Sequence, residues 1–254
     1  MQKLTESVIN WIRDYFKDNP DGKVICGISG GKDSTIVAAL CVEALGKDRV
    51  IGVLMPNGFQ NDIVDSHKVC EHLGIKHVTV NIVNAYFGLL HAIDPGMDLD
   101  GNTPIPASIS TNLPSRLRMC TLYSIAALYP NSRVVNTSNF SERYIGYSTK
   151  FGDGAGDFSP LGNLTVREVL QIGDDLGLPH DLVHKTPSDG MSGKSDEEKI
   201  GFTYEELDEY IYSRWNEEEF PGTDEVAAKI DHLFRINRHK LADMPRYPDW
   251  NFKY

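Results

Sequence analysis

Apolar residues in the first 140 positions fall into short β-rich runs, separated by longer segments with helical spacing. A first helix is predicted to start near Leu4. The elements predicted after it are, in chain order, strand 23–28, helix 33–45, strand 49–56, helix 61–74 and strand 76–82. Strands that alternate with helices in this way predict right-handed crossovers and a parallel sheet.

The rest of the chain is predicted to be mainly helical. Residues 94–114 lack periodicity and are rich in Asp, Pro and Ser, which predicts an irregular segment. The elements predicted beyond it are helix 115–130, strand 133–139, a helix from 141, and helices 164–177, 203–215 and 224–240. The polar segment 188–199 predicts a mobile loop. These patterns together predict an α/β fold: a doubly wound parallel sheet with additional C-terminal helices, in a single domain over residues 1–254.

Charge and cysteine usage restrict the possible partners and compartment. The chain of 254 residues has a formal charge of −11, which disfavours nucleic acid and anionic membranes as partners. Its four cysteines lie far apart, and no pair has the C-x-x-C spacing of a zinc or redox site. The amphipathic N-terminal segment lacks the apolar region of a signal peptide, and no later segment is long enough to span a bilayer. A cytoplasmic protein is therefore predicted.

The stretch GISGGKDS, residues 27–34, lies between a predicted strand and a predicted helix. It is not a P-loop, because Asp33 follows Gly31 and Lys32 where that motif has Ser or Thr. Its glycines allow backbone N–H groups to approach an anion, and the helix start adds the positive end of a dipole. Asp33 would repel phosphates unless a cation lay between them, which indicates Mg²⁺; the alternative is that Asp33 caps the helix.

GISGGKDS resembles the SGGxDS loop of the ATP-pyrophosphatase group, where that loop holds the pyrophosphate end of ATP while a substrate is adenylated. A second stretch, NTSNFSERYIGYSTKFGDGAGDFSPLGNL at 136–164, closely resembles the signature of the NAD synthetase family. NLPSRLRM at 112–119, TPSDG, SDEEKIGFTYEELDEYI and the HK pair at 239–240 fit that family's order. The resemblance runs from about residue 4 to residue 240, and it implies a Rossmann-like sheet of the adenine-nucleotide alpha-hydrolase type.

The resemblance implies an ammonia-dependent ligase. ATP would adenylate the nicotinate carboxyl of deamido-NAD with loss of pyrophosphate, and ammonia would then displace AMP to give NAD. Mg²⁺ would be the cofactor, held by Asp33 and Glu142, and the assembled form would be a homodimer. For Glu142 alone, the alternative is an exposed acid in the first turn of a helix. Asp157 is a candidate to deprotonate ammonium, so the implied catalytic residues are Asp33, Glu142 and Asp157.

The binding residues that the resemblance implies fall into two groups. Those expected to bind ATP are Gly27, Ile28, Ser29, Gly30, Gly31, Lys32, Asp33, Ser34, Thr137 and Ser188. Those expected to bind deamido-NAD are Arg116, Lys150, Asp157, His239 and Lys240, with Arg118 as a further candidate. Gly152, Gly154 and Gly156 would let their loop pass close to the dinucleotide. Segment 188–199 either closes over the adenylate or is only a connection.

Two positions depart from the family pattern. Val166 stands where the family commonly has a lysine that contacts ATP, and Lys32 stands where many members carry Gln. Either Lys32 or Arg167 is expected to supply the missing charge, or ATP binds more weakly. A Val166→Lys change is accordingly expected to strengthen ATP binding or leave it unchanged.

Two other classes of protein share part of the pattern. A tRNA-thiolating enzyme of the same group would want catalytic cysteines and a basic surface, and a nucleotide-sensing protein would not need both carboxylates. The scattered cysteines, the charge of −11 and the presence of Asp33 and Glu142 disfavour both classes. Only about one helix precedes the phosphate loop, so no glutaminase domain is expected and free ammonia is the predicted nitrogen source.

Overall fold

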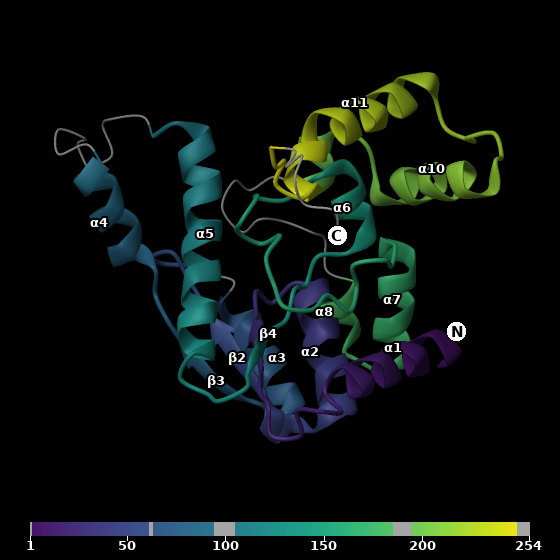
Figure 1. Ribbon diagram of the computed structural model, residues 1–254. Coiled ribbons are helices and arrows are strands. Elements are labelled where there is room, and N and C mark those ends of the chain that lie inside the picture. Colours follow the sequence, from purple (N-terminus) through teal and green to yellow (C-terminus); the bar gives the residue numbers. More distant parts are fainter. Residues whose placement is uncertain (1, 61–62, 94–104, 185–194, 248–254) are drawn as a thin grey trace.

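The computed structural model describes residues 2–60, 63–93, 105–184 and 195–247 (Figure 1). Its parallel strands are β1 Val24–Gly27, β2 Val50–Leu54, β3 Lys76–Thr79 and β4 Arg133–Val134. The helices of the sheet region are α1 Gln2–Tyr15, α2 Lys32–Leu45, the 3-10 turn η1 Lys47–Arg49, α3 Ile63–Leu73, α4 Val83–Ile93 and α5 Ala107–Ala126. Those that follow are α6 Phe140–Ile145, α7 Val166–Asp175, α8 His180–Val183, α9 Asp196–Ile200, α10 Tyr204–Asn216 and α11 Asp224–Leu241. Within these ranges no helix is long and apolar enough to cross a bilayer.

The strands are arranged in the order β3-β2-β1-β4, and helices cover both faces of the sheet. Val24 and Cys26 of β1 are buried in the core that includes residues of α1, α2 and α7. Ile25, between them, is buried in a second core with Val134 and Ala126, on the side of α5. Apolar residues at every position of a strand are required when both faces are covered. The predicted doubly wound parallel sheet is confirmed.

The helices after residue 139 build a third core of their own. Its buried residues are Ile145, Val166, Phe202, Tyr204, Leu207, Tyr210, Ile211 and Ile230, from α6, α7, α10, α11 and the segment before α10. Figure 1 shows α10 and α11 beyond the carboxyl end of the sheet, on the opposite side of the view from α4 and α5. The predicted additional C-terminal helices are therefore present, and they lie near the edge of the sheet that carries the phosphate loop.

Helices α4 and α5 differ from the sequence expectation. Helix α4 was not predicted, although Tyr86 and Leu90 bury its inner face. Helix α5 begins at Ala107 and continues through Pro114, inside the segment predicted to be irregular. The frequency of Pro and Ser was misleading there, because Pro106 lies just before the helix and Pro114 is buried within it.

Strand β4 and the segment near residue 195 also differ. The predicted strand 133–139 keeps only two ladder residues, and the chain then turns through a bridge from Val135 to Phe158. The predicted loop 188–199 overlaps helix α9, which runs to Ile200 and whose first turn is closed by Ser195 and Glu198 in a capping box. Residues 188–194 lie outside the described residues, so the rest of that prediction stays open.

Candidate active site

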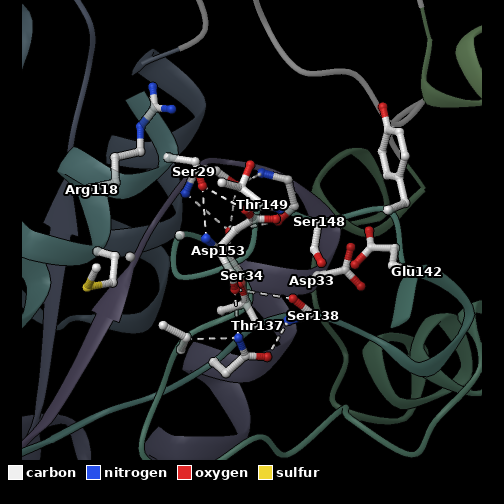
Figure 2. Close-up of a pocket in the computed structure, with 18 of the residues that line it drawn as sticks. Ser29, Asp33, Ser34, Arg118, Thr137, Ser138, Glu142, Ser148, Thr149 and Asp153 are labelled. Atoms are coloured by element: carbon white, nitrogen blue, oxygen red, sulfur yellow. Dashed lines mark hydrogen bonds between the residues drawn. The ribbon is translucent and has the colours of Figure 1, made fainter. Parts of the chain in front are cut away.

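A cleft of about 980 Å³ lies where the loops after β1 and β4 meet. Its walls come from the phosphate loop, α5, the segment after α6, α9 and α11. Figure 2 shows the part of the cleft around the phosphate loop, Thr137, Glu142 and Asp153. Ligands of open parallel sheets bind beyond the carboxyl ends of the strands, and the two loops lie at that edge. The predicted ATP-binding residues that line the cleft are Gly27, Ile28, Ser29, Gly31, Lys32, Asp33, Ser34 and Thr137.

The phosphate loop is held in shape by its own hydroxyl and backbone groups. Gly30 has a φ of +79°, and a Cβ atom there would lie 2.9 Å from the backbone nitrogen of Ser66. The Ser34 hydroxyl donates to the Gly31 carbonyl at 3.1 Å and accepts from the backbone N–H of Ser29 at 3.2 Å. Only glycine fits the turn at position 30, since L residues rarely adopt that φ and no space exists for a side chain.

Gly31, not Asp33, caps helix α2. The cap makes no side-chain hydrogen bond, and Asp33 lies in the first turn of the helix. The alternative function of Asp33 as a cap is therefore wrong. Its carboxylate accepts instead from the side-chain amide of Asn139 and binds the Lys32 ammonium, at 3.1 and 2.6 Å.

Glu142 lies beside Asp33 in the cleft, as Figure 2 shows. It is the third residue of α6, and its Oε2 accepts from the backbone N–H of Asn139 at 3.3 Å. Burial raises the pKa of Glu142 to about 8, and the negative charge of the nearby Asp33 carboxylate is the second cause of this increase. The alternative of an ordinary exposed acid is wrong for this side chain. Two carboxylates at close range favour a cation between them.

Lys32 is only 6% exposed, and its ammonium contacts the Asp33 carboxylate. Burial alone would lower the pKa of its ammonium, but Asp33 and Glu142 outweigh burial and the pKa is raised. The ammonium also lies 5.5 Å from the centre of the Tyr204 ring. Lys32 therefore places a positive charge in the lining of the cleft, next to the Asp33 carboxylate.

Asp153 organises the second wall of the cleft, and the sequence analysis did not identify it. Its carboxylate accepts from the Ser115 hydroxyl at 2.6 Å and from the backbone N–H of Thr149 at 2.8 Å. Its carbonyl accepts at 2.7 Å from the side-chain amide of Asn136, the residue before Thr137. The sequence signal for this residue is the Asp of FGDG, because Asp is common in turns, where its side chain bonds to nearby backbone groups. Only the glycines of this stretch were considered above.

The glycines of this wall bring parts of the chain together. A Cβ atom at Gly152 would lie 2.3 Å from the Ser115 hydroxyl, and one at Gly156 would lie 2.9 Å from the backbone nitrogen of Asn136. Close packing against Ser115 or Asn136 therefore requires a glycine at each of these two positions, whether or not a dinucleotide binds nearby. Gly154 has more room, with its nearest neighbour at 3.5 Å.

Three residues predicted to bind the dinucleotide contact one another beside the cleft. Arg116 donates to the carbonyl of Lys150 at 3.3 Å, and the Lys150 ammonium donates to the carbonyl of His239 at 2.6 Å. The next residue, Lys240, lines the cleft and donates to the carbonyl of Gly146 at 2.8 Å. The structure thus brings residues from α5, the segment after α6 and the end of α11 to one rim.

The remaining predicted residues are placed differently. Asp157 is outside the described cleft lining, and its carboxylate accepts from the backbone N–H of Val134 at 2.7 Å and from the Tyr123 hydroxyl at 3.2 Å. Arg118, a secondary candidate, lines the cleft and donates to the carbonyl of Met55 at 3.0 Å. Ser188 lies outside the described residues.

Comparison with known proteins decides the family. The NAD synthase family model matches residues 4–244. The chain belongs to the NAD synthase family. It is 39% identical to the NH(3)-dependent NAD(+) synthetase of Alkaliphilus metalliredigens, over 96% of this chain and 97% of that protein.

Two solved structures superpose on nearly the whole chain. The NMN synthetase of Francisella tularensis has a TM-score of 0.84 and 31% identity, with 99% of this chain and 98% of that chain covered. The NH3-dependent NAD synthetase of Campylobacter jejuni subsp. jejuni NCTC 11168 has a TM-score of 0.79 and 28% identity, with 98% of both chains covered. The resemblance inferred from the sequence motifs is confirmed, and with it the adenine-nucleotide alpha-hydrolase type of fold.

Val166, the departure from the NAD synthase pattern, is a core residue in this chain. It is 7% exposed and packs with Ile145, Phe202 and Tyr204, and it is not part of the described cleft lining. Arg167 does not reach the cleft either, because its guanidinium lies over the Tyr212 ring. A lysine at position 166 would have to bury its charge or displace this core.

Val166→Lys is therefore expected to lower the free energy of unfolding by at least about 2 kcal/mol, since an unpaired charge would enter an apolar core. This replaces the expectation of tighter ATP binding. Urea denaturation should be compared with Val166→Met, which has similar length and no charge. A Val166→Lys protein as stable as Val166→Met, with tighter ATP binding, would contradict the core assignment.

Proposed function

We propose that this chain is an ammonia-dependent NAD synthetase that converts deamido-NAD to NAD, with ATP cleaved to AMP and pyrophosphate. The observation that carries the proposal is the meeting of an SGGxDS loop and two close carboxylates in one cleft of an NAD synthase fold. Curated relatives that align with nearly the full chain are named NH(3)-dependent NAD(+) synthetase. Residues 1–254 would act as one unit, because residues from both halves of the chain line the cleft.

Mg²⁺ suits the side chains of this cleft. Among the described residues, no three His, Cys, Asp or Glu side chains are grouped to hold a metal. Mg²⁺ commonly takes only one or two protein carboxylates and completes its shell with phosphate oxygens and water. Asp33 and Glu142 would supply those carboxylates. When bound, the ion would neutralise charge on the phosphates of ATP.

The protein groups would act in two stages. Backbone N–H groups of the phosphate loop, the N-terminus of α2 and Thr137 would hold ATP, so that the nicotinate carboxylate can attack the α-phosphorus. Pyrophosphate leaves with the negative charge of the broken bond. Ammonia then attacks the carbonyl of the adenylated carboxyl, AMP departs, and one proton is released. Arg116, Lys150, His239 and Lys240 would bind the dinucleotide at the rim.

The direct test is to incubate the protein with ATP, Mg²⁺, deamido-NAD and ammonium and to quantify NAD, AMP and pyrophosphate. Equal amounts of NAD, AMP and pyrophosphate are expected. Release of ADP and phosphate, or release of pyrophosphate without an amide product, would contradict the proposed reaction.

Nicotinate mononucleotide is the second candidate substrate. It is favoured by the similarity to the NMN synthetase of Francisella tularensis, and by the absence of Arg116, Lys150 and His239 from the described cleft lining. The same amidation of the mononucleotide would give NMN. A comparison of kcat/KM for the two substrates would decide between them, and a larger value for the mononucleotide would replace the dinucleotide in the proposal.

A homodimer is proposed through the exposed apolar residues of α4. Phe87, Leu89 and Ile93 of α4 are 37%, 42% and 65% exposed, an apolar surface that a second copy could bury. Figure 1 shows α4 at the side of the molecule away from α10 and α11. Leu89→Glu with Ile93→Glu is expected to halve the mass in light scattering, whereas Ile236→Glu on α11 should not. An unchanged mass would exclude this face.

The cytoplasm is the proposed compartment. Cys26, Cys41 and Cys70 are buried free thiols, and Cys120 is free as well. Unpaired cysteines of this kind are typical of proteins in a reducing compartment.

A further inference from the structure

Asn139 contacts both carboxylates of the cleft, and no sequence motif assigned it a role. It is 0% exposed and forms the N-cap of α6. Its side-chain Nδ2 donates to Oδ1 of Asp33 at 3.1 Å, across 106 positions of the chain. Its backbone N–H donates to Oε2 of Glu142 at 3.3 Å. One buried residue therefore joins the first turn of α2 to the loop after β4.

The cap alone does not require an asparagine. Oδ1 of Asn139 accepts from the backbone N–H of Glu142 at 2.9 Å, which is the ordinary contact of a cap. The capping boxes at α7, α9 and α10 begin instead with Thr165, Ser195 and Thr203. Those hydroxyl residues close the helix end equally well. What asparagine adds is an amide donor on the same side chain as the capping acceptor.

We infer that Asn139 is a positioning residue that sets the separation of Asp33 and Glu142, so that both can bind one divalent cation. It holds one oxygen of each carboxylate, and Oδ2 of Asp33 faces the Lys32 ammonium. Groups that hold the ligands of a metal by hydrogen bonds commonly change metal affinity about 10- to 100-fold when removed. The inference rests on the proposed metal site at Asp33 and Glu142.

The decisive variants are Asn139→Ser and Asn139→Thr, which keep a capping hydroxyl and remove the amide that reaches Asp33. The probe is Mn²⁺, added with an ATP analogue that has a methylene group between the α- and β-phosphates. Free Mn²⁺ is measured by electron paramagnetic resonance. Both variants are expected to bind Mn²⁺ about 10- to 100-fold more weakly than the unaltered protein. The Mg²⁺ concentration for half-maximal activity should rise by a similar factor, with a smaller change in kcat.

Two reference variants separate the possible failures. Thr203→Ala removes the matching cap of α10 and should lower the melting temperature with Mn²⁺ binding unchanged. Asp33→Asn should weaken Mn²⁺ binding at least as much as the Asn139 variants. If Asp33→Asn has no effect, the proposed metal site itself fails. If Asp33→Asn weakens binding but both Asn139 variants bind Mn²⁺ normally, or lose only stability, Asn139 is a structural cap and the inference is overturned.

Discussion

Asp33→Asn is expected to reduce kcat about a thousandfold while the protein stays folded. Loss of a charged metal ligand removes several kcal/mol of transition-state stabilisation, and about 4 kcal/mol corresponds to a thousandfold in rate. The amide oxygen introduced by this substitution could still accept from the Asn139 side chain, so the local packing should survive. NAD formation at saturating substrates measures the effect, and the melting temperature by circular dichroism checks the fold.

Glu142→Gln is expected to give a similar loss for the same reason. Glutamine can replace glutamate in a capping box, so the contact with the Asn139 backbone and the end of α6 should be retained. The double variant should lose little more than either single variant, because two ligands of one ion act as a unit. Asp48→Asn in η1, which does not line the described cleft, is the matched control. Near-normal activity of either cleft variant would remove the two-carboxylate metal site.

Local signals in the sequence were sufficient for most of the fold. Strands β1 and β2 are short apolar runs that end near Gly or Pro, and such runs identify buried parallel strands without tertiary information. Strand β3 lies at the edge of the sheet and is mostly exposed, so its signal was the β-branched residues of KHVTVNI and not an apolar run. Helix α4 was missed because its residues are apolar on more than one side, which blurs the helical period. Strand β4 is short because the chain leaves the sheet at Asn136, whose amide bonds to Asp153 and Ala155. That contact joins residues that no local pattern connects.

The sequence could predict only those site residues that lie within a continuous sequence motif. The SGGKDS loop and Glu142 could be identified because each lies in a recognisable stretch, and the structure brings them into one cleft. Asn139 could have been suspected from NFSE, an N-x-x-E capping signal, but its bond to Asp33 depends on the packing of two distant loops. Val166 shows that a match to a family pattern can also mislead. Its buried environment, created by α10 and α6, could not be inferred from a position in a family pattern.

Glutamine is expected to give no NAD with the purified chain, whereas ammonium supports the full reaction. Hydrolysis of glutamine by an amidotransferase needs a reactive thiolate. Burial raises the pKa of Cys26 well above its ordinary value, and burial likewise raises the pKa of Cys41 to about 12 and of Cys70 to about 11. Cys120 is exposed on α5 and is not part of the described cleft lining.

The measurement compares NAD formation with ammonium and with glutamine freed of contaminating ammonium. Cys120→Ser is the matched control, and it should leave the ammonium-dependent rate unchanged because the thiol has no part in the reaction. Ammonia, not ammonium, is the nucleophile, so the rate at subsaturating total ammonium should rise with pH above neutrality. Efficient glutamine-dependent synthesis by this chain alone would contradict the proposed nitrogen source. Synthesis that appears only after a second protein is added would preserve the ligase chemistry and indicate a separate glutaminase that delivers ammonia to this cleft.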